Sequence, residues 1–150
     1  MIALGCDTAG FELMQAVKGR LDERGLCYID FGTHDGGNAC DYPQYAKLVA
    51  EAVAEAVAEG KAKAERGIVI CGTGIGMAIA ANRYAGVRCA LCHDAFTALQ
   101  CREHNDANVL AMGARVVSSE LALEMLDIWL DTDFSKEERH GRRVKQIEIT

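Results

Sequence analysis

The chain has 150 residues, of which 50% are hydrophobic and 25% charged, and its formal net charge is −6 at pH 7. One domain is expected at this length, and the acidic balance argues against nucleic acid as a partner. No apolar stretch approaches the ~20 residues that a membrane span needs, and no basic leader precedes the first apolar run. We therefore expect one globular domain over residues 1–150, located in the cytoplasm, with no membrane partner.

The seven cysteines are an odd count, and most of them fall within apolar runs. Without an export signal, this pattern favours free thiols in a reducing compartment over a disulfide framework. Cys89 and Cys92 are spaced like a redox or zinc motif, but they fall in a predicted strand, where residues three apart face opposite ways. We interpret both as core residues. A metal set of Cys92, His93 and His104 has no recognised spacing, and no metal is expected.

Short apolar runs alternate with helical patterns along the whole chain. The runs are four to six residues long, rich in Ile, Val, Leu and Cys, and show little polar alternation, which is typical of parallel strands buried on both faces. Strands are predicted at 2–6, 26–31, 67–71, 87–92 and 107–112. Helices are predicted at 11–24, 44–59, 75–84, 95–103, 119–130 and 135–147.

Local signals mark the ends of two of these helices. Gly25 is a natural stop for the first, and Ser118 or Ser119 can cap the helix at 119–130. The latter is expected to bury a stripe made of Leu121, Met125, Ile128 and Trp129. The β–α alternation predicts an α/β fold with a single Rossmann-like, doubly wound, five-stranded parallel sheet flanked by helices. Ligands of such sheets bind at the carboxyl ends of the strands.

The third predicted strand runs into a glycine-rich loop, Cys71-Gly72-Thr73-Gly74-Ile75-Gly76, which a helix follows. Its glycines allow a tight turn whose N–H groups can face an anion, and a cysteine beside a helix N-terminus is favoured as a thiolate. A dinucleotide fingerprint fails because its last position holds Met77 or Ile79, and a cysteine phosphatase loop fails because Met77 replaces the required arginine. The alternative is a buried cysteine whose neighbouring glycines serve packing.

Two further polar residues stand at the ends of predicted elements. Asp7 follows the first strand, where it can bind a substrate hydroxyl or cap the next helix, and the residue alone favours the cap. His104 lies between a helix and the fifth strand, where it can act as an acid or base near neutral pH. Taken alone, it is better explained as a surface loop histidine.

Positive charge gathers in residues 136–145, which hold five basic and two acidic side chains on an otherwise acidic protein. Such a local patch suits a small anion better than a polymer. Arg139 and Arg143 are four residues apart, so on a helix they share a face and can converge on a phosphate, and Arg115 can join them. Taken alone, the stretch is better explained as a solvated helix face.

Together these pieces resemble the type B ribose-5-phosphate isomerase family, which also contains galactose-6-phosphate and allose-6-phosphate isomerases. The resemblance covers essentially the whole chain, with several motifs in the same order. They are Gly5-Cys6-Asp7-x-Ala9-Gly10-Phe11, Asp41-Tyr42-Pro43, Cys71-Gly72-Thr73-Gly74-x-Gly76, Ala80-Ala81-Asn82, His104-Asn105-Asp106-x-Asn108-Val109-Leu110, Gly113-x-Arg115 and Arg139-His140-x-x-Arg143.

The resemblance implies an aldose–ketose isomerase of a phosphorylated sugar, with ribose 5-phosphate and ribulose 5-phosphate as the first expectation. It makes Cys71 the base that moves a proton between C2 and C1 through a cis-enediolate, and His104 the acid that opens the sugar ring. Thr73 and the loop amides would stabilise the oxyanion. The residues implied to bind the substrate are Asp7, Thr8, Tyr42, Gly72, Gly74, Ile75, Gly76, Asn105, Arg115, Arg139 and Arg143.

The resemblance also implies a homodimer or tetramer whose active sites are shared between subunits, with the helix at 135–147 reaching a neighbour. No cofactor is expected. The chain departs from the family at Thr8, where histidine is common, and this bears on the choice of sugar. The alternatives are the same chemistry on a tetrose 4-phosphate, allose 6-phosphate, galactose 6-phosphate or free aldose, and a non-catalytic phosphosugar-binding module.

Overall fold

One parallel sheet forms the centre of the computed structural model, which describes residues 1–59 and 64–148. Its strands are β1 (Ile2–Cys6), β2 (Tyr28–Asp30), β3 (Arg66–Cys71), β4 (Cys89–Leu91) and β5 (Val109–Gly113). They lie in the order β2-β1-β3-β5-β4, and every pair is parallel. After β2 the chain crosses to the other side of β1 to form β3. This reversal is the topological switch point, where a cleft opens between strand ends.

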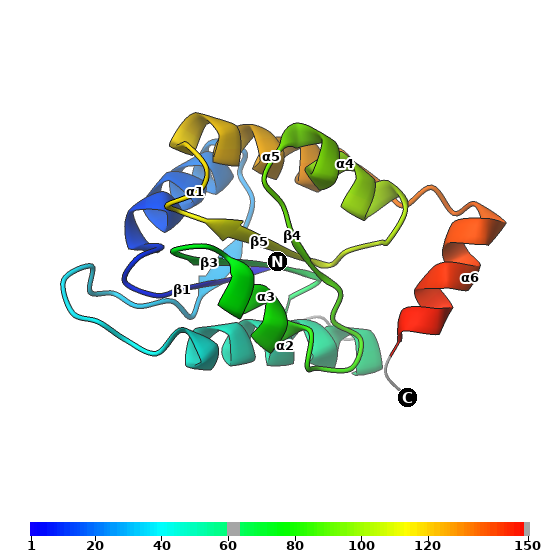
Figure 1. The fold of residues 1–150 in the computed structure, drawn as a ribbon, viewed down its shortest axis with the longest axis horizontal. Coiled ribbons are helices and arrows are strands. Elements are labelled where there is room, and N and C mark those ends of the chain that lie inside the picture. The colour runs from blue at the N-terminus through cyan, green and yellow to red at the C-terminus, as the bar shows by residue number, and fades with distance from the viewer. Residues whose placement is uncertain (60–63, 149–150) are drawn as a thin grey trace.

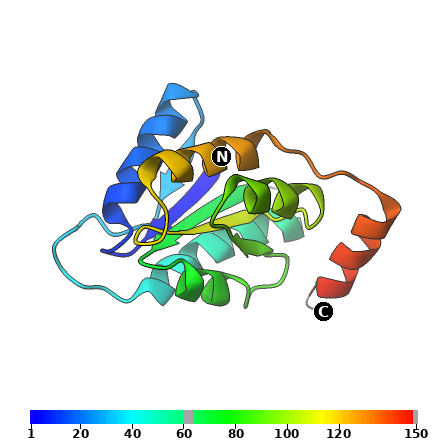
Figure 2. The same ribbon diagram turned by 45° about the horizontal axis from the view of Figure 1, so that its top comes forward.

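Helices cover both faces of the sheet, as the predicted fold requires (Figure 1). The helices α1 (Phe11–Glu23), α4 (Ala95–Glu103) and α5 (Ser119–Asp131) lie on one face, and α2 (Tyr42–Glu59) and α3 (Ile75–Ala81) lie on the other. The last helix, α6 (Glu138–Ile147), stands apart from both layers, at the opposite end of the molecule from the loop 31–41 (Figure 2). None of the helices in the described residues is long and apolar enough to cross a membrane.

The alternation of side chains along β3 divides the core into two layers. Ile68 and Ile70 pack with the apolar faces of α1 and α5, whereas Val69 and Cys71 pack with α2 and α3. The layers are built from residues such as Met14, Leu21, Leu110, Met125 and Trp129 on one face, and Val49, Val53, Met77 and Ala111 on the other. Cys71 thus ends the central strand on the face that α3 covers.

Several boundaries differ from those predicted by the sequence. The edge strands β2 and β4 hold three residues each instead of six, because only one neighbouring strand supports them. Helix α2 begins at Tyr42 rather than residue 44, since a proline at position 43 is tolerated in the first turn of a helix. Helix α3 ends at Ala81 rather than residue 84, and α6 begins at Glu138 rather than residue 135.

The predicted helix signals are confirmed with one correction. Gly25 has a φ of 65° directly after α1, and the Ser118 side chain accepts a hydrogen bond from the Leu121 N–H at the start of α5. The buried stripe of α5 contains Ala122, Met125, Leu126 and Trp129, so the prediction was wrong for Leu121 and Ile128, which are partly buried. Because α5 packs against α1 and α4 as well as the sheet, its apolar face is broader than one stripe.

Candidate active site

Cys71 stands at the carboxyl end of the central strand, with its thiol beside the turn that starts α3. The N–H of Gly74 donates a hydrogen bond to the Cys71 Sγ across 3.1 Å, and the residue is 5% exposed. Gly74 has a φ of 76°, which glycine adopts without strain. The Gly74 amide was expected to stabilise the substrate oxyanion, but in the structure its N–H donates to the Cys71 sulfur.

The other loop glycines let large side chains approach the backbone closely. A Cβ on Gly76 would lie 2.5 Å from the ring of Tyr42, and a Cβ on Gly72 would lie 3.1 Å from the guanidinium of Arg115. The Arg115 N–H also donates to the Gly72 carbonyl at 2.9 Å. The first turn of α3 is tied to the loop as well, because the Ile75 N–H donates to the Thr73 Oγ1 at 3.3 Å. The ring of Tyr42 and the Arg115 cation therefore both lie directly against the loop.

A cleft of about 880 Å³ opens above this loop, between the carboxyl ends of β1 and β3. It brings together most of the expected residues of the first half of the chain and of the glycine loop. Its lining includes Asp7, Thr8, Tyr42, Cys71, Gly72, Thr73, Ile75, Gly76 and Arg115. Of the expected loop residues, Gly74 is not among the lining residues, because it is buried behind the Cys71 sulfur.

Both functions weighed for Asp7 are compatible with its position. Its Oδ1 accepts a hydrogen bond from the Gly10 N–H at 3.0 Å, which is a cap-like contact at the start of α1. The same side chain is only partly buried and lines the cleft. The carboxylate has two oxygens, so the cap contact leaves one of them for a hydroxyl in the cleft.

Thr8 and Cys40 form a pair in the lining of the cleft, and sequence reasoning missed Cys40. The Thr8 hydroxyl donates to the Asn38 carbonyl and lies 3.3 Å from the Cys40 Sγ. Partial burial opposes ionisation of Cys40, but hydrogen bonds with Thr8 and Tyr45 outweigh it and lower the pKa of the thiol below its ordinary value. The cleft therefore contains two cysteines. The only signal in the sequence was the position of Cys40 directly before Asp41-Tyr42-Pro43.

The remaining expected residues, His104, Asn105, Arg139 and Arg143, lie outside this cleft. His104 ends α4, and its ring stacks on that of His140 in α6, with centroids 4.1 Å apart. Arg139 and Arg143 are exposed on α6, where the Arg139 Nε donates to the Glu137 carboxylate at 2.8 Å. Within one chain, the structure thus divides the expected site into two groups.

His140, to which no function was assigned from the sequence, connects α6 to His104. It is 3% exposed, and its Nδ1 lies 2.7 Å from the Ser135 hydroxyl. Burial lowers its pKa, and the nearby charges of His104 and Arg139 lower it further, so the ring is neutral at pH 7. A neutral ring can stack on His104 without repelling it.

Arg102 fixes the turn that carries His104. It is 6% exposed, and its guanidinium donates to the Asp106 carboxylate at 2.9 Å and to the Ala107 carbonyl at 2.8 Å. A positive φ of 46° at Asp106 closes the same turn. Buried charges keep their place only when they are paired and hydrogen-bonded, and here they hold the backbone between α4 and β5.

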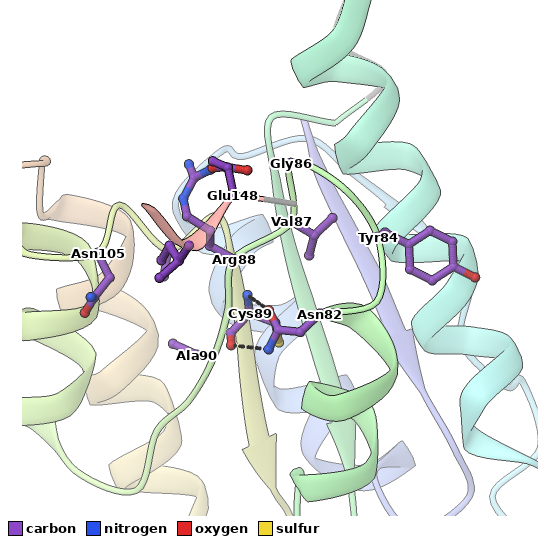
Figure 3. Close-up of a pocket in the computed structure, with 11 residues that line it drawn as sticks. Asn82, Tyr84, Gly86, Val87, Arg88, Cys89, Ala90, Asn105 and Glu148 are labelled. Carbon is purple, nitrogen blue, oxygen red and sulfur yellow. Dashed lines mark hydrogen bonds and ion pairs between the residues drawn. The ribbon is translucent and has the colours of Figure 1, made fainter. Parts of the chain in front are cut away.

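Asn105 contributes instead to a separate pocket of about 410 Å³ beside the edge strand β4 (Figure 3). There the Asn82 amide pairs with the Cys89 backbone, donating to its carbonyl at 2.8 Å and accepting from its N–H at 2.7 Å. Arg88 in the same pocket forms ion pairs with Asp106 and Glu148. Because Asn82 occupies the backbone groups of this edge and Arg88 is already paired, the pocket offers little to an anion.

The cleft has the properties of an enzyme site for a small polar ligand. It lies at the switch point of an open parallel sheet, and a thiol, a hydroxyl, a carboxylate and a guanidinium line it together. Among the residues that the structure describes, no group of three His, Cys, Asp or Glu side chains could hold a metal ion. The fold and the site define an α/β enzyme with a thiol and a guanidinium in one cleft.

Comparison with known proteins agrees with this assignment. The family model of the ribose/galactose isomerases matches residues 2–147. The chain is 46% identical to ribose-5-phosphate isomerase B of Escherichia coli over 146 residues, covering 97% of this chain and 93% of that protein. It is 42% identical to the D-erythrulose-4-phosphate isomerase of Pectobacterium atrosepticum, over 89% of this chain and 84% of that protein.

A solved structure extends the likeness to three dimensions. Ribose-5-phosphate isomerase B of Mycoplasma genitalium, determined with bound ribulose-5-phosphate, superposes with a TM-score of 0.89 at 34% identity and covers 97% of this chain and 92% of that one. The chain belongs to the ribose/galactose isomerase family. It is an aldose–ketose isomerase.

Proposed function

We propose that this protein interconverts ribose 5-phosphate and ribulose 5-phosphate by proton transfer at Cys71. The observation that carries the proposal is the convergence of Cys71, Thr73 and Asp7 on one cleft at the carboxyl ends of β1 and β3. The similarity to ribose-5-phosphate isomerases of type B, one of them with ribulose-5-phosphate bound, supports the same substrate.

In the proposed reaction, the Cys71 thiolate takes the proton from C2 of the open-chain aldose. The electrons form the C1–C2 double bond of a cis-enediolate, and the same proton returns to C1 while a hydroxyl proton passes between O2 and O1. Thr73 would donate to the developing oxyanion, and two observations support this role: its Oγ1 accepts from the Ile75 N–H, and the residue lines the cleft. Asp7 would accept hydrogen bonds from sugar hydroxyls.

A second copy of the chain is proposed to complete the site. Ring opening needs an acid and a phosphate needs cations, yet His104, Arg139 and Arg143 lie outside the cleft of their own chain. In a twofold dimer each cleft can receive the His104–α6 group of the other copy, which gives two equivalent sites. Arg139 would exchange its contact with Glu137 for the phosphate.

A four-carbon sugar phosphate is the second candidate substrate, and Thr8 favours it. The Thr8 hydroxyl donates its proton to the Asn38 carbonyl and lies beside the Cys40 sulfur of its own chain. It therefore has no free proton with which to bind a distant substrate atom. The likeness to an erythrulose-4-phosphate isomerase supports the same alternative. Allose 6-phosphate, galactose 6-phosphate and free aldoses are further alternatives for the same chemistry.

A substrate panel tests the proposal. The value of kcat/KM is measured for ribose 5-phosphate, erythrose 4-phosphate, allose 6-phosphate, galactose 6-phosphate and free ribose. We expect the highest value with ribose 5-phosphate and a value lower by at least about 10²-fold with free ribose, because the cations then have no phosphate to bind. A higher value with the tetrose would establish the second candidate. Ligand-induced stabilisation without turnover of any sugar would show a binding module and overturn the proposal.

A further inference from the structure

Two thiols outside the cleft lie beside each other in the core. The Sγ of Cys92, directly after β4, is 3.8 Å from the Sγ of Cys101 in the last turn of α4. Both side chains are buried, with 1% and 7% of each residue exposed, and both belong to the core layer under α4 and α5. Neither takes part in the proton transfer proposed for Cys71.

Of the two, Cys92 was predicted to be a core residue, and the burial of both side chains fits a place in the core. Burial alone does not bring the two sulfurs together. Cys92 and Cys101 come from different elements and meet only because α4 packs on the sheet. A disulfide has an S–S distance of about 2.05 Å, so the sulfurs need to close by roughly 1.8 Å. Side-chain rotation and a small shift of the last turn of α4 can supply a movement of this size.

The ionisation of the two thiols is linked. The hydrogen bond with Cys101 lowers the pKa of Cys92 despite burial, and a further hydrogen bond with Thr97 acts in the same direction. The pKa of Cys101 is raised, because its thiol already bonds to Cys92 and burial opposes a second thiolate beside the first. Cys92 is therefore the more readily ionised of the two thiols, and a thiolate is the form that attacks a peroxide or a disulfide.

We propose that Cys92 and Cys101 are an oxidation site that forms a reversible disulfide on reaction with a peroxide. The Cys92 thiolate attacks one peroxide oxygen, the O–O bond breaks, hydroxide leaves and a sulfenic acid forms. The Cys101 thiol then attacks the Cys92 sulfur, loses its proton and displaces the hydroxyl group as water. Two electrons pass from the two sulfurs to the peroxide, and a dithiol reductant returns them.

The disulfide would act on the turn that carries His104. The carbonyl of Cys101 accepts a hydrogen bond from the Ala107 N–H at 2.9 Å, and the adjacent Arg102 holds both ends of the same turn. A shift of Cys101 toward Cys92 therefore moves the backbone on which His104 stands. This consequence rests on the proposed function of His104, whereas formation of the disulfide does not.

Peptide mapping of the intact protein tests the disulfide directly. Trypsin cleavage after Arg88 and Arg102 releases residues 89–102, which contain Cys89, Cys92 and Cys101. After exposure to hydrogen peroxide and alkylation, this peptide should lose two hydrogens and regain them with dithiothreitol. The loss should persist in the Cys89→Ala variant and disappear in Cys101→Ser. Cys101→Ala provides a second variant should the serine disturb the core.

Two outcomes would overturn the disulfide. One is a peptide in which Cys92 and Cys101 both stay alkylatable while the exposed Cys27 is oxidised, and the other is a two-hydrogen loss that depends on Cys89.

Turnover is then compared between wild type and Cys101→Ser after the same peroxide pulse, since oxidation of Cys71 affects both equally. Wild type should show an additional loss of at least about threefold that dithiothreitol reverses. An equal loss in both would disprove the effect on His104, and absence of turnover before oxidation would count against the proposed function alone.

Discussion

The N–H of Gly74 donates a hydrogen bond to the sulfur of Cys71 at 3.1 Å, so the turn that begins α3 holds the thiol in one position. If Cys71 is the general base, as proposed, replacing it by alanine should lower kcat/KM by about 10²–10⁴-fold, the contribution of a positioned general base. Since the residue is small and lies at the end of a strand, the free energy of unfolding should fall by only about 1 kcal/mol. Steady-state kinetics and urea unfolding measure the two effects.

The matched control for this substitution is Cys27→Ala, which removes an exposed thiol far from the loop. Its turnover and stability should stay at the wild-type values. Near-normal turnover in Cys71→Ala would remove this thiol from the mechanism.

Gly74 should tolerate no side chain. A Cβ there would lie 2.5 Å from the Leu91 Cδ1 and 2.8 Å from the Met112 carbonyl carbon, at a φ of 76°. Gly74→Ala should therefore lower the free energy of unfolding by about 2 kcal/mol or more and displace the N–H from the sulfur. Gly19→Ala is the control, because Gly19 lies within α1 with open space around its Cβ position. The free energy of unfolding of Gly19→Ala should rise by about 0.5–1 kcal/mol, because alanine has the higher helix propensity. Equal urea midpoints for the two variants would contradict the geometry.

Cys40 and Cys71 line the same cleft, so a bound substrate should shield both. We expect ribose 5-phosphate to slow alkylation of Cys40 and Cys71 by iodoacetamide at least about fivefold while leaving Cys27 unchanged. Mass spectrometry of quenched time points measures the rate at each thiol. If ribose 5-phosphate protected Cys71 but not Cys40, the sugar would bind away from Thr8 and Cys40.

The order of elements and the glycine loop could be predicted from the sequence because their causes are local. Buried parallel strands need continuous apolar runs, and residues that follow β1 and β3 meet at one edge of the sheet, so Asp7 and Cys71 were bound to lie near each other. The edge strands β2 and β4 were predicted too long, because their length depends on neighbours that sequence patterns do not reveal.

Relations between distant segments could not be predicted in this way. Arg139 and Arg143 lie outside the cleft because of the direction that α6 takes after α5, and the approach of Cys92 to Cys101 depends on how α4 packs. The stacking of His104 on His140 joins two segments whose only local signals are polar residues. Each of these contacts depends on the tertiary structure, and no repeating pattern in the sequence predicts it.

The buried His140 should make stability sensitive to mild acid. Its pKa is lowered by burial and by the charges of His104 and Arg139, so the folded protein binds the proton less readily than the unfolded chain. The contribution of His140 to the free energy of unfolding is therefore constant above the ordinary histidine pKa of about 6.5. It falls as the pH drops below that value, because the unfolded chain then binds the proton more readily. The Tm of wild type should therefore fall more between pH 7.5 and 5.5 than that of His140→Gln, as thermal unfolding at each pH would show. Parallel Tm curves would exclude this contribution.

Mixing two inactive variants tests whether a second copy completes the site. In a dimer of one Cys71→Ala chain and one His104→Ala chain, one site carries both substitutions and the other carries neither. Random reassociation makes half of the dimers mixed, so about a quarter of wild-type turnover should return. As controls, each variant is taken through the same dissociation and reassociation alone, and each should stay inactive. If Cys71 and His104 of one chain served the same site, every site in the mixture would be defective, and no turnover would return after subunit exchange verified by mass spectrometry.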